Sequence, residues 1–471
     1  MSTGNRTTSA TRPGDPAGGP FSPAYRLITI AIIALVTIIA FEAMAIATAM
    51  PQAAEDLDAV RGYGLTFSVM LTAQLLGIVL AGVWSDRSGP MPGLYAGQLL
   101  FAVGAAICGL ATSFPMLLVG RAVTGLGAGV VIVALYVVVG QVYPGTTRPR
   151  MFSFISAAWI LPSLVGAPLS GWLATAFTWR LVFWVVVPPA LLTLAVVAKQ
   201  SAAIRGRDDR SDRGTHDRFA HRRTARLGAL VALAAGLLQL GTYERFPLLS
   251  WQALAALGGL GGLLLVTPRL VPAGTMRLAR GMPSIIASRF LLNAAFNGTI
   301  TYVPLMLTQE RGTTLATAGI VLALGSLGWS AGSWVQGLAA MAGRRASLVS
   351  VGGLFLALGC LGLVLVTALG WPVGLFAPAM VLAGTGMGLA STSLSVLLLD
   401  VAPVGDYGKA SAALQLSDVL GSVIGIAGAS ALFASMHTMG GDTRTYLVIW
   451  GVLAAVAALV VVGGRRCVVR A

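Results

Sequence analysis

The sequence predicts an all-α integral membrane protein made of two pseudo-symmetric six-helix bundles and an inserted helix pair, fourteen transmembrane helices in all. Three observations support this fold class. Of the 471 residues, 56% are hydrophobic and only 10% are charged, a composition typical of membrane proteins. Apolar runs of about 20 residues, long enough to cross a bilayer, recur along the chain. A glycine motif near residue 125 also returns in the second half.

The first half of the chain supplies the first bundle. Residues 1–25 have no apolar core, which favours a disordered cytoplasmic tail over a cleaved signal peptide. Residues 26–198 contain six apolar runs separated by charged residues or by Pro and Gly, and they predict the N-terminal six-helix bundle. The predicted helices are 27–50, 65–85, 92–112, 115–142, 151–174 and 180–198.

The second half begins with an insertion. The basic segment 199–226 predicts a cytoplasmic linker, and two shorter apolar runs in 227–267 predict the inserted helix pair. A cytoplasmic loop at 268–282 precedes the C-terminal six-helix bundle at 283–463, and 464–471 form a cytoplasmic tail. The predicted helices of this bundle are 284–307, 315–340, 346–369, 372–400, 408–435 and 445–463. If the inserted pair does not span the membrane, twelve helices remain. Their orientation is the same, because removing two crossings leaves the later segments on the same sides of the membrane.

Basic residues indicate the orientation in the membrane. With both termini cytoplasmic, the inner segments hold 24 Lys and Arg residues and the outer loops hold five, as the positive-inside rule requires. The net charge of +15 is therefore a topology signal of a multi-pass cell-membrane protein. No aromatic stacking platform accompanies the basic residues, so nucleic acid is not expected as a partner. The three cysteines lack a spacing suited to a metal site or a disulfide framework.

The glycine motif indicates an internal repeat. The stretch TGLGAGVVIVALYVVVGQVYP (124–144) matches AGTGMGLASTSLSVLLLDVAP (383–403) at a fixed offset. The matched positions are Gly125, Gly127, Gly129, Pro144 and Gly166 with Gly384, Gly386, Gly388, Pro403 and Gly425. One six-helix unit is thus used twice, and repeats of this kind frame a substrate path near the bilayer centre.

Two acidic residues lie inside predicted helices. Glu42 is the single carboxylate in the stretch AFEAMAIATAMPQ. A charged carboxylate in hydrocarbon is unfavourable, so Glu42 is expected to take up a proton readily or to bind a cation, unless it is a snorkelling structural acid. Asp418 occupies the repeat position of Trp159. It is a candidate for proton coupling or substrate contact, or it is a capped polar residue near the cytoplasmic end of its helix.

Three further motifs carry a resemblance. GVWSDRSGPMP (82–92) ends helix 2, LLVGRAVTGLGAG (117–129) places Arg121 inside helix 4, and LPSLVGAPLSG (161–171) gives helix 5 a glycine-proline kink. Together they resemble the major facilitator superfamily, in particular its drug:proton antiporters with fourteen spanning helices. The resemblance covers nearly all of residues 26–463.

The resemblance implies gating and coupling roles. The family's signature after helix 2 is matched by Gly82, Asp86, Arg87 and Gly89, although Pro90-Met91-Pro92 replace its usual basic end. Its helix 5 signature is matched by Gly166, Pro168 and Gly171, with Ala167 where the family usually has glycine. Both sets are expected to act in gating. The family also uses an acid of helix 1 and an arginine of helix 4 in proton transfer, which implies coupling roles for Glu42 and Arg121.

Polar and aromatic side chains in the bundles are candidate substrate contacts. Amides can hydrogen-bond a ligand, but polar residues also hold membrane helices together, and aromatic residues of this kind are often simple packing. The candidates are Trp159, Asn293, Phe296, Asn297 and Gln415. Arg289 lies near the cytoplasmic end of its helix and is expected to snorkel toward the cytoplasm.

These expectations favour a proton-coupled exporter of amphipathic or cationic drugs and other small molecules. No phosphate-binding loop motif is present, so ATP coupling is unsupported, and the proton gradient, not a bound cofactor, is expected to supply the energy. The chain is expected to be a monomer surrounded by membrane lipids. The alternatives are a lipid exporter of the same fold, an importer, which the helix 5 signature disfavours, and a non-transporting membrane scaffold or sensor. An enzyme is disfavoured because no paired His, Asp or Glu constellation lies near one membrane face.

Overall fold

The computed structural model describes residues 19–23, 25–143, 147–205, 218–242, 250–401, 407–437 and 441–467. All regular elements in these ranges are helices. The α-helices are α1 (Arg26–Asp56), α2 (Tyr63–Ser88), α3 (Pro90–Gly109), α4 (Phe114–Val142), α5 (Arg148–Ala157), α6 (Ile160–Ala176), α7 (Trp179–Trp184), α8 (Val187–Arg205), α9 (Arg218–Thr242), α10 (Trp251–Leu270), α11 (Met282–Gln309), α12 (Leu315–Gly337), α13 (Arg345–Ala368), α14 (Phe376–Val401), α15 (Tyr407–Met436) and α16 (Thr443–Arg466). Short 3-10 turns lie at Val60–Gly62, Thr275–Arg277, Ala339–Arg344 and Val373–Leu375.

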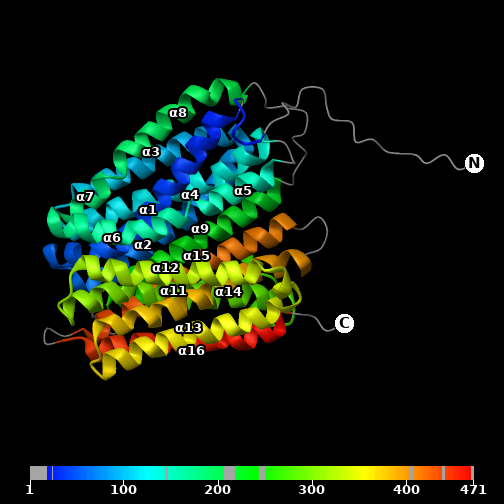
Figure 1. Cartoon of the computed structure of the whole chain (residues 1–471). Helices are drawn as coiled ribbons and strands as arrows, with labels where there is room; N and C mark the ends of the chain where they lie inside the picture. Colours follow the sequence, from blue (N-terminus) through cyan, green and yellow to red (C-terminus); the bar gives the residue numbers. More distant parts are fainter. Residues whose placement is uncertain are drawn as a thin grey trace, which may run out of the picture.

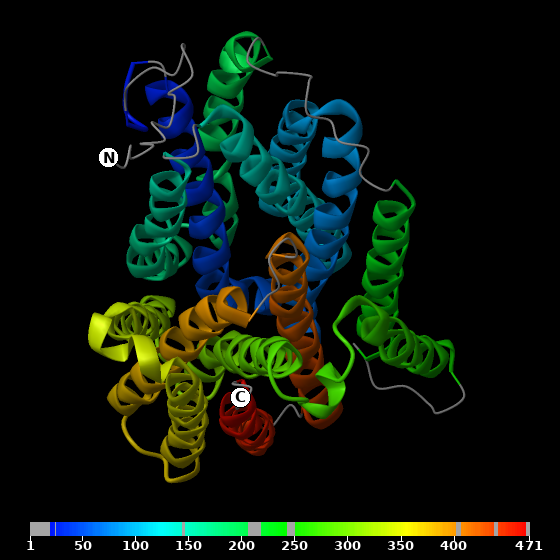
Figure 2. The same cartoon turned by 90° about the vertical axis from the view of Figure 1, so that its right-hand side faces the viewer.

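The helices run roughly parallel to one axis, and α1 begins at the same end of the bundle at which α16 ends (Figure 1). We call this end the terminus side and the opposite end the distal side. Seen from the terminus side in Figure 2, the helices of the first half, α1–α8, lie in the upper part and those of the second half, α11–α16, in the lower part. The helices α9 and α10 lie at one flank. The predicted arrangement of two bundles with an inserted pair is confirmed.

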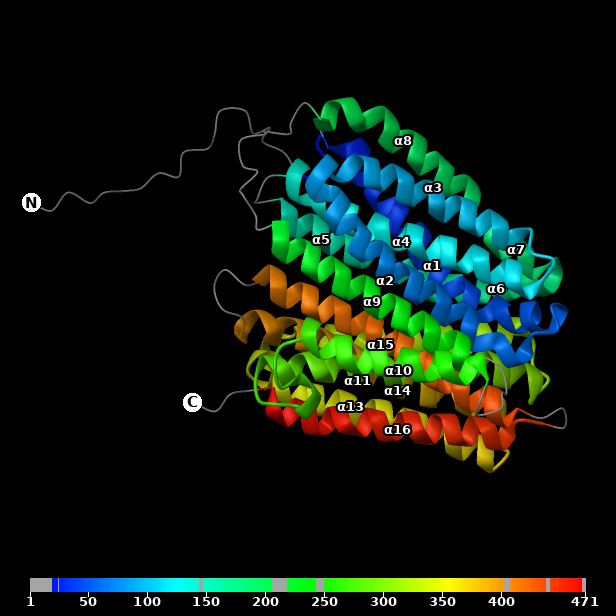
Figure 3. The same ribbon diagram turned by 180° about the vertical axis from the view of Figure 1, so that it is seen from behind.

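The described helices that could cross a membrane number between the twelve and the fourteen that the sequence left open. Within the described residues, twelve helices are long and apolar enough to cross a membrane, and α10 is one of them. Two shorter apolar stretches are Leu164–Ala176 in α6 and Arg226–Gly241 in α9. Since α6 continues the crossing begun by α5 and α9 runs beside α10 along the bundle (Figure 3), the chain is a multi-pass membrane protein. Helix extends to Arg205 and resumes at Arg218, so it enters both ends of the expected linker 199–226.

Two predicted helices are each broken in two. The crossing expected at 151–174 is divided between α5 and α6, and the one expected at 180–198 is divided between α7 and α8. Proline explains both breaks, because it has no N–H to donate four residues back and is best tolerated in the first turn of a helix. Pro162 lies in the first turn of α6, and Pro188 and Pro189 lie in the first turn of α8. The helix α6 itself continues through Pro168.

The glycine contacts confirm the internal repeat. A Cβ atom on Gly125 of α4 would lie only 2.1 Å from the carbonyl oxygen of Met70 in α2, and Gly129 meets α2 in the same way. In the second half, Gly384 and Gly388 of α14 have equally close contacts with the backbone of α12. The same sequence motif therefore makes the same helix crossing in both bundles.

The buried core shows how the two bundles meet. On the distal side one continuous cluster, the distal core, contains residues of both halves, among them Ala49, Tyr63, Tyr302 and Phe433. Toward the terminus side each half has its own cluster, one built around α1, α3, α4 and α8 and the other around α11, α13, α14 and α16. The halves are thus joined by apolar packing on the distal side and have separate cores on the terminus side.

The inserted pair covers one seam between the halves. Val231 of α9 and Leu263 of α10 share a buried cluster with Leu75 of α2 and Leu420 of α15. The pair therefore packs against one helix of each bundle. Figure 3 shows α9 beside α2 and α15, with α10 beside it.

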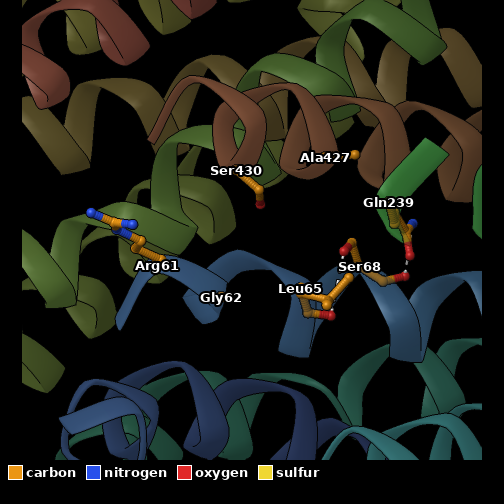
Figure 4. A pocket seen from close by; sticks show the side chains of 7 residues that line it. All are labelled: Arg61, Gly62, Leu65, Ser68, Gln239, Ala427 and Ser430. Carbon is orange, nitrogen blue, oxygen red and sulfur yellow. Dashed lines mark hydrogen bonds between the residues drawn. The ribbon is translucent and has the colours of Figure 1, made fainter. Parts of the chain in front are cut away.

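A hydrogen-bonded contact and a small pocket mark the distal part of this seam. Gln239 of α9 donates from its amide to the hydroxyl of Thr72 at 2.7 Å and to the carbonyl of Ser68 at 3.3 Å. Figure 4 shows the pocket where α2, α9 and α15 meet. Its lining residues are Arg61, Gly62, Leu65, Ser68, Gln239, Ala427 and Ser430.

Candidate functional site

The first candidate site is a buried ion pair within the N-terminal bundle. Arg121 of α4 donates from Nη1 to Oε1 of Glu42 on α1. The side chains of Arg121 and Glu42 are only 2% and 1% exposed. Glu42 lies between Ile39, which belongs to the terminus-side core of its half, and Ala45, which belongs to the distal core. The pair thus lies at the level where the shared packing of the two halves begins.

The surroundings of the pair hold the arginine more firmly than the acid. Arg121 also donates from Nε to the carbonyl of Thr66 at 3.1 Å and from Nη2 to the sulfur of Met70 at 2.9 Å, both on α2. The second carboxylate oxygen of Glu42, Oε2, is buried and has no hydrogen-bond partner among the described residues. A buried oxygen without a hydrogen-bond donor is unfavourable. This atom can therefore readily accept a proton, or a hydrogen bond from a donor group of a ligand.

A second ion pair lies in the C-terminal bundle. Arg289 of α11 contacts both carboxylate oxygens of Asp418 on α15, through Nε to Oδ1 and through Nη2 to Oδ2 at 2.9 Å. Arg289 also donates from Nη1 to the carbonyl and hydroxyl oxygens of Ser391 on α14, at 2.5 and 2.7 Å. The expectation that Arg289 snorkels to the cytoplasm is wrong, because its side chain is only 13% exposed and is held by these partners.

Two predicted amides extend this second pair. Asn293 donates to Oδ1 of Asp418 at 2.7 Å, and Asn297 donates to the hydroxyl of Ser422 at 3.0 Å. Ser422 in turn donates to the carbonyl of Asp418 at 2.8 Å. Asn293 and Asn297 therefore belong to one polar network around Asp418, which also explains how these polar groups are accommodated within an apolar bundle.

The other predicted substrate residues lie apart from this network. Phe296 is buried in the C-terminal core and makes an edge contact with Trp329 at 5.4 Å between ring centroids. Gln415 is exposed on α15, one turn before Asp418. Trp159 is 38% exposed at the break between α5 and α6. Their predicted role in substrate binding stays a prediction.

The predicted gate residues fall into two groups. The backbone places Gly82, Asp86 and Arg87 near the end of α2, while the side chains of Asp86 and Arg87 lie outside the described residues. Gly89 caps this helix with φ of +76°, a conformation that glycine adopts without strain. The backbone conformation of the turn between α2 and α3 therefore explains why glycine occupies this position.

The helix 5 signature lies where the two bundles touch. A Cβ atom on Gly171 of α6 would be 2.6 Å from the carbonyl oxygen of Leu315, at the start of α12. One on Gly319 of α12 would be 2.5 Å from the carbonyl of Ala167, the residue before Pro168. Gly166 instead faces α1, near Met44. These small residues allow α6 and α12 to cross with their backbones in close contact.

Sequence reasoning missed several partners in these sites. Glu42 and Arg121 were each predicted to act in proton coupling, yet nothing in the linear sequence joined them, and Thr66 and Met70 carried no signal. The pairing of Arg289 with Asp418 also escaped notice. A search for opposite charges away from the ends of the apolar runs would have singled out Glu42 with Arg121 and Asp418 with Arg289.

Comparison with known proteins identifies the relatives of this chain. An uncharacterized MFS-type transporter of Mycobacterium tuberculosis is 27% identical over 443 residues, covering 89% of this chain and 61% of that protein. The chain thus spans less than two thirds of that relative's length. The multidrug transporter MdtP of Bacillus subtilis is 24% identical over 438 residues, with 91% and 78% covered. A triacylglyceride transporter of Mycobacteroides abscessus is 28% identical over 394 residues, with 76% and 72% covered.

Solved structures and the family model agree with the fold. A crystal structure of the peptide transporter POT in complex with sulfate superposes with a TM-score of 0.68 at 15% identity, covering 94% of each chain, which shows a shared fold. The family model of the Major Facilitator Superfamily matches residues 31–426. These residues include both ion pairs, both copies of the glycine motif and the inserted pair between them. The chain belongs to the Major Facilitator Superfamily.

Proposed function

We propose that this protein is a proton-coupled exporter of amphipathic or cationic drugs and other small molecules, working by alternating access as an antiporter. The observation that carries the proposal is the buried Glu42–Arg121 pair. Glu42 offers one carboxylate oxygen to Arg121 and keeps the other without a donor among the described residues. An acid in this position can exchange its counter-ion for a proton or for the cationic group of a substrate.

The physical basis of coupling is competition for one carboxylate. In a medium of low dielectric constant, an ionised acid needs a cation nearby, and protonation removes that need. A proton and a cationic substrate therefore cannot both neutralise Glu42 at the same time. Antiport follows, because release of one is required for binding of the other.

The packing of the two bundles supports alternating access. The distal core joins the halves, whereas their terminus-side cores are separate. If both termini are cytoplasmic in the cell membrane, as the basic residues indicate, the protein is in a state closed toward the outside. Export then requires the distal core to separate and the terminus sides to approach each other.

The relatives support this substrate class in part. MdtP of Bacillus subtilis is a multidrug transporter by name. The energy source would be the proton gradient, without a bound cofactor, and the protein would act as a monomer in contact with membrane lipids. The predicted substrate contacts Trp159, Asn293, Asn297 and Gln415 would then line the path used by the compound, and Asp418 would be a second acid for coupling.

A second candidate function is lipid export. It is favoured by the similarity to the triacylglyceride transporter, which covers 76% of this chain. The two candidates differ in what crosses the membrane. The purified protein can be reconstituted in vesicles that contain a fluorescent acylglycerol or a cationic dye. Transport of the acylglycerol across the vesicle membrane without transport of the dye would favour lipid export over drug export.

The test is pH-driven export in proteoliposomes. Glu42→Gln mimics the protonated acid, so this variant should still bind an amphipathic dye that carries no cationic group. It should bind a cationic dye more weakly than the wild type and should lose uphill transport driven by a pH gradient. Glu42→Asp shortens the side chain by one methylene and should keep part of the activity. Asp58→Asn is the matched control, because Asp58 is an exposed acid just beyond the same helix. Full pH-driven export by Glu42→Gln would refute the proposal.

A further inference from the structure

The distal contact between the two halves includes a buried tyrosine that bridges them. Tyr63 is the first residue of α2 and is 0% exposed. Its hydroxyl donates to the carbonyl oxygen of Thr301 on α11 at 2.8 Å. This hydrogen bond joins a helix of the first bundle to a helix of the second. It must break whenever the distal sides of the two bundles separate.

Close packing surrounds this bond. The ring of Tyr63 lies 5.5 Å from the ring of Tyr302, measured between centroids. The next residue, Gly64, leaves no room for a side chain, since a Cβ atom there would be 1.8 Å from the hydroxyl of Ser430 on α15 and 2.5 Å from that of Tyr302. The start of α2 is therefore fitted tightly against both α11 and α15, next to the pocket that Gly62 and Ser430 help to line (Figure 4).

The same turn of α2 is held by the arginine of the first ion pair. Arg121 donates to the carbonyl of Thr66 at 3.1 Å. The hydroxyl of Thr66 donates back to the carbonyl of Tyr63 at 2.7 Å. A continuous line of hydrogen bonds thus runs from Glu42 through Arg121 and Thr66 to Tyr63, and from there to the other bundle.

We propose that Tyr63 is a latch on the distal side, and that the Glu42–Arg121 pair keeps it closed while the carrier is empty. The inference rests on the proposed function, because it assigns to the same ion pair a second task. While Glu42 is ionised and unoccupied, it fixes Arg121, which fixes the first turn of α2 and with it the Tyr63 bond. A proton or a cationic substrate at Glu42 releases Arg121 and loosens that turn.

Such a latch meets a requirement of antiport, namely that the empty carrier does not change conformation. If an exporter that exchanges one proton for one substrate also changes conformation while empty, protons cross the membrane without export of substrate, and the proton gradient is dissipated. A latch that opens only when Glu42 is neutralised prevents this, and either ligand can open it. Among the described residues, Arg121 of α4 and the thiol of Cys108 on α3 are the titratable groups that interact electrostatically with Glu42.

The test measures the distance between the distal ends of the two halves. Spin labels are placed at Thr112→Cys, between α3 and α4, and at Gly374→Cys, in the 3-10 turn between α13 and α14; both positions are exposed. A Cβ atom at Gly374 meets nothing within 4 Å. The native Cys108, Cys360 and Cys467 are buried. Double electron-electron resonance on the full chain in nanodiscs, without substrate, then gives the populations of closed and separated distal sides across a range of pH.

Loss of one hydrogen bond sets the expected size of the effect. Tyr63→Phe should raise the ratio of separated to closed molecules about 2- to 12-fold, the change that corresponds to one net hydrogen bond. Gly64→Ala should raise it as well, by steric overlap with Ser430. Tyr446→Phe is the matched control and should change nothing, because Tyr446 is a buried tyrosine of the same core whose hydroxyl has no partner among the described residues.

The link to Glu42 is tested by combining variants. Glu42→Gln should raise the separated population and remove its dependence on pH, and adding Tyr63→Phe should change it less than twofold further. Wild-type populations in Tyr63→Phe, an equal shift in Tyr446→Phe, or independent effects of Glu42→Gln and Tyr63→Phe would overturn the proposal. The distances require neither substrate nor transport. Full pH-driven export by Glu42→Gln would refute the proposed function, whereas unchanged distances refute only the latch.

Discussion

Removing Arg289 should destabilise the protein far more than removing the whole ion pair to which it belongs. In the Arg289→Met variant, Asp418 loses the guanidinium that contacts both of its oxygens and keeps only Asn293 as a side-chain donor among the described residues. An uncompensated carboxylate then remains inside the bundle. In the double variant Arg289→Met with Asp418→Leu, neither charge remains.

The magnitude follows from burial and partners. Breaking a fully buried ion pair costs about 3–5 kcal/mol. The two side chains here are 13% and 19% exposed, so partial hydration lowers the expected loss to about 2–3 kcal/mol. Asp418→Asn leaves Arg289 bound to the oxygens of Ser391 and should cost less, about 1–2 kcal/mol. The double variant should lie within about 1 kcal/mol of the wild type.

The assay is reversible unfolding in mixed micelles titrated with sodium dodecyl sulfate, followed by tryptophan fluorescence. It is applied to the wild type, to these three variants and to Asp418→Leu, the single variant that completes the double-variant cycle. A coupling energy of at least about 1 kcal/mol from the double-variant cycle is expected for side chains in direct contact. Additive effects, with the double variant as unstable as the sum of the single ones, would refute the reasoning. Normal stability together with lost proton coupling in Asp418→Asn would instead assign Asp418 to transport.

Two further predictions concern packing and orientation. Gly125→Ala and Gly384→Ala place a Cβ atom 2.1 and 1.9 Å from a backbone oxygen of the neighbouring helix, and each should lower the free energy of unfolding by about 1–3 kcal/mol. Gly236→Ala, where a Cβ atom meets nothing within 4 Å, should be neutral in the same unfolding assay, and equal behaviour of the three variants would contradict the close crossing. Gly374→Cys on the distal side should react with an impermeant maleimide in intact cells, while Gly337→Cys on the terminus side should react only after permeabilisation, and the reverse pattern would invert the topology.

Much of the fold could be predicted because membrane solvent imposes strong rules. Apolar runs had to be helices, since an isolated backbone in hydrocarbon has no other way to satisfy its hydrogen bonds. The match of Gly125 with Gly384 predicted that the two bundles use the same helix packing, and the glycine contacts confirm it. The helix breaks were missed although Pro162 and the Pro188-Pro189 pair carried the signal, because hydropathy alone does not register a missing N–H.

The candidate sites were predicted as single residues and not as pairs. Glu42 stood out because a carboxylate is rare in a spanning helix, but its contact with Arg121 joins residues 79 positions apart and depends on how α1 packs beside α4. Arg289 was misjudged because its depth was inferred from sequence position alone, whereas Asp418 on another helix determines where its guanidinium lies. The role of Tyr63 depends on a contact between bundles, which no local pattern encodes.

The two broken crossings make the bundles mechanically unequal. In the first half, α5 with α6 and α7 with α8 each contain an interruption where proline leaves a carbonyl group without its helical donor. Their counterparts in the second half, α15 and α16, are continuous over 30 and 24 residues. The first bundle therefore has two hinges at which its terminus-side segments, α5 and α8, can bend relative to α6 and α7. The corresponding helices of the second bundle are uninterrupted and rigid. Domain motion in this protein should accordingly combine bending in one half with rigid rotation of the other.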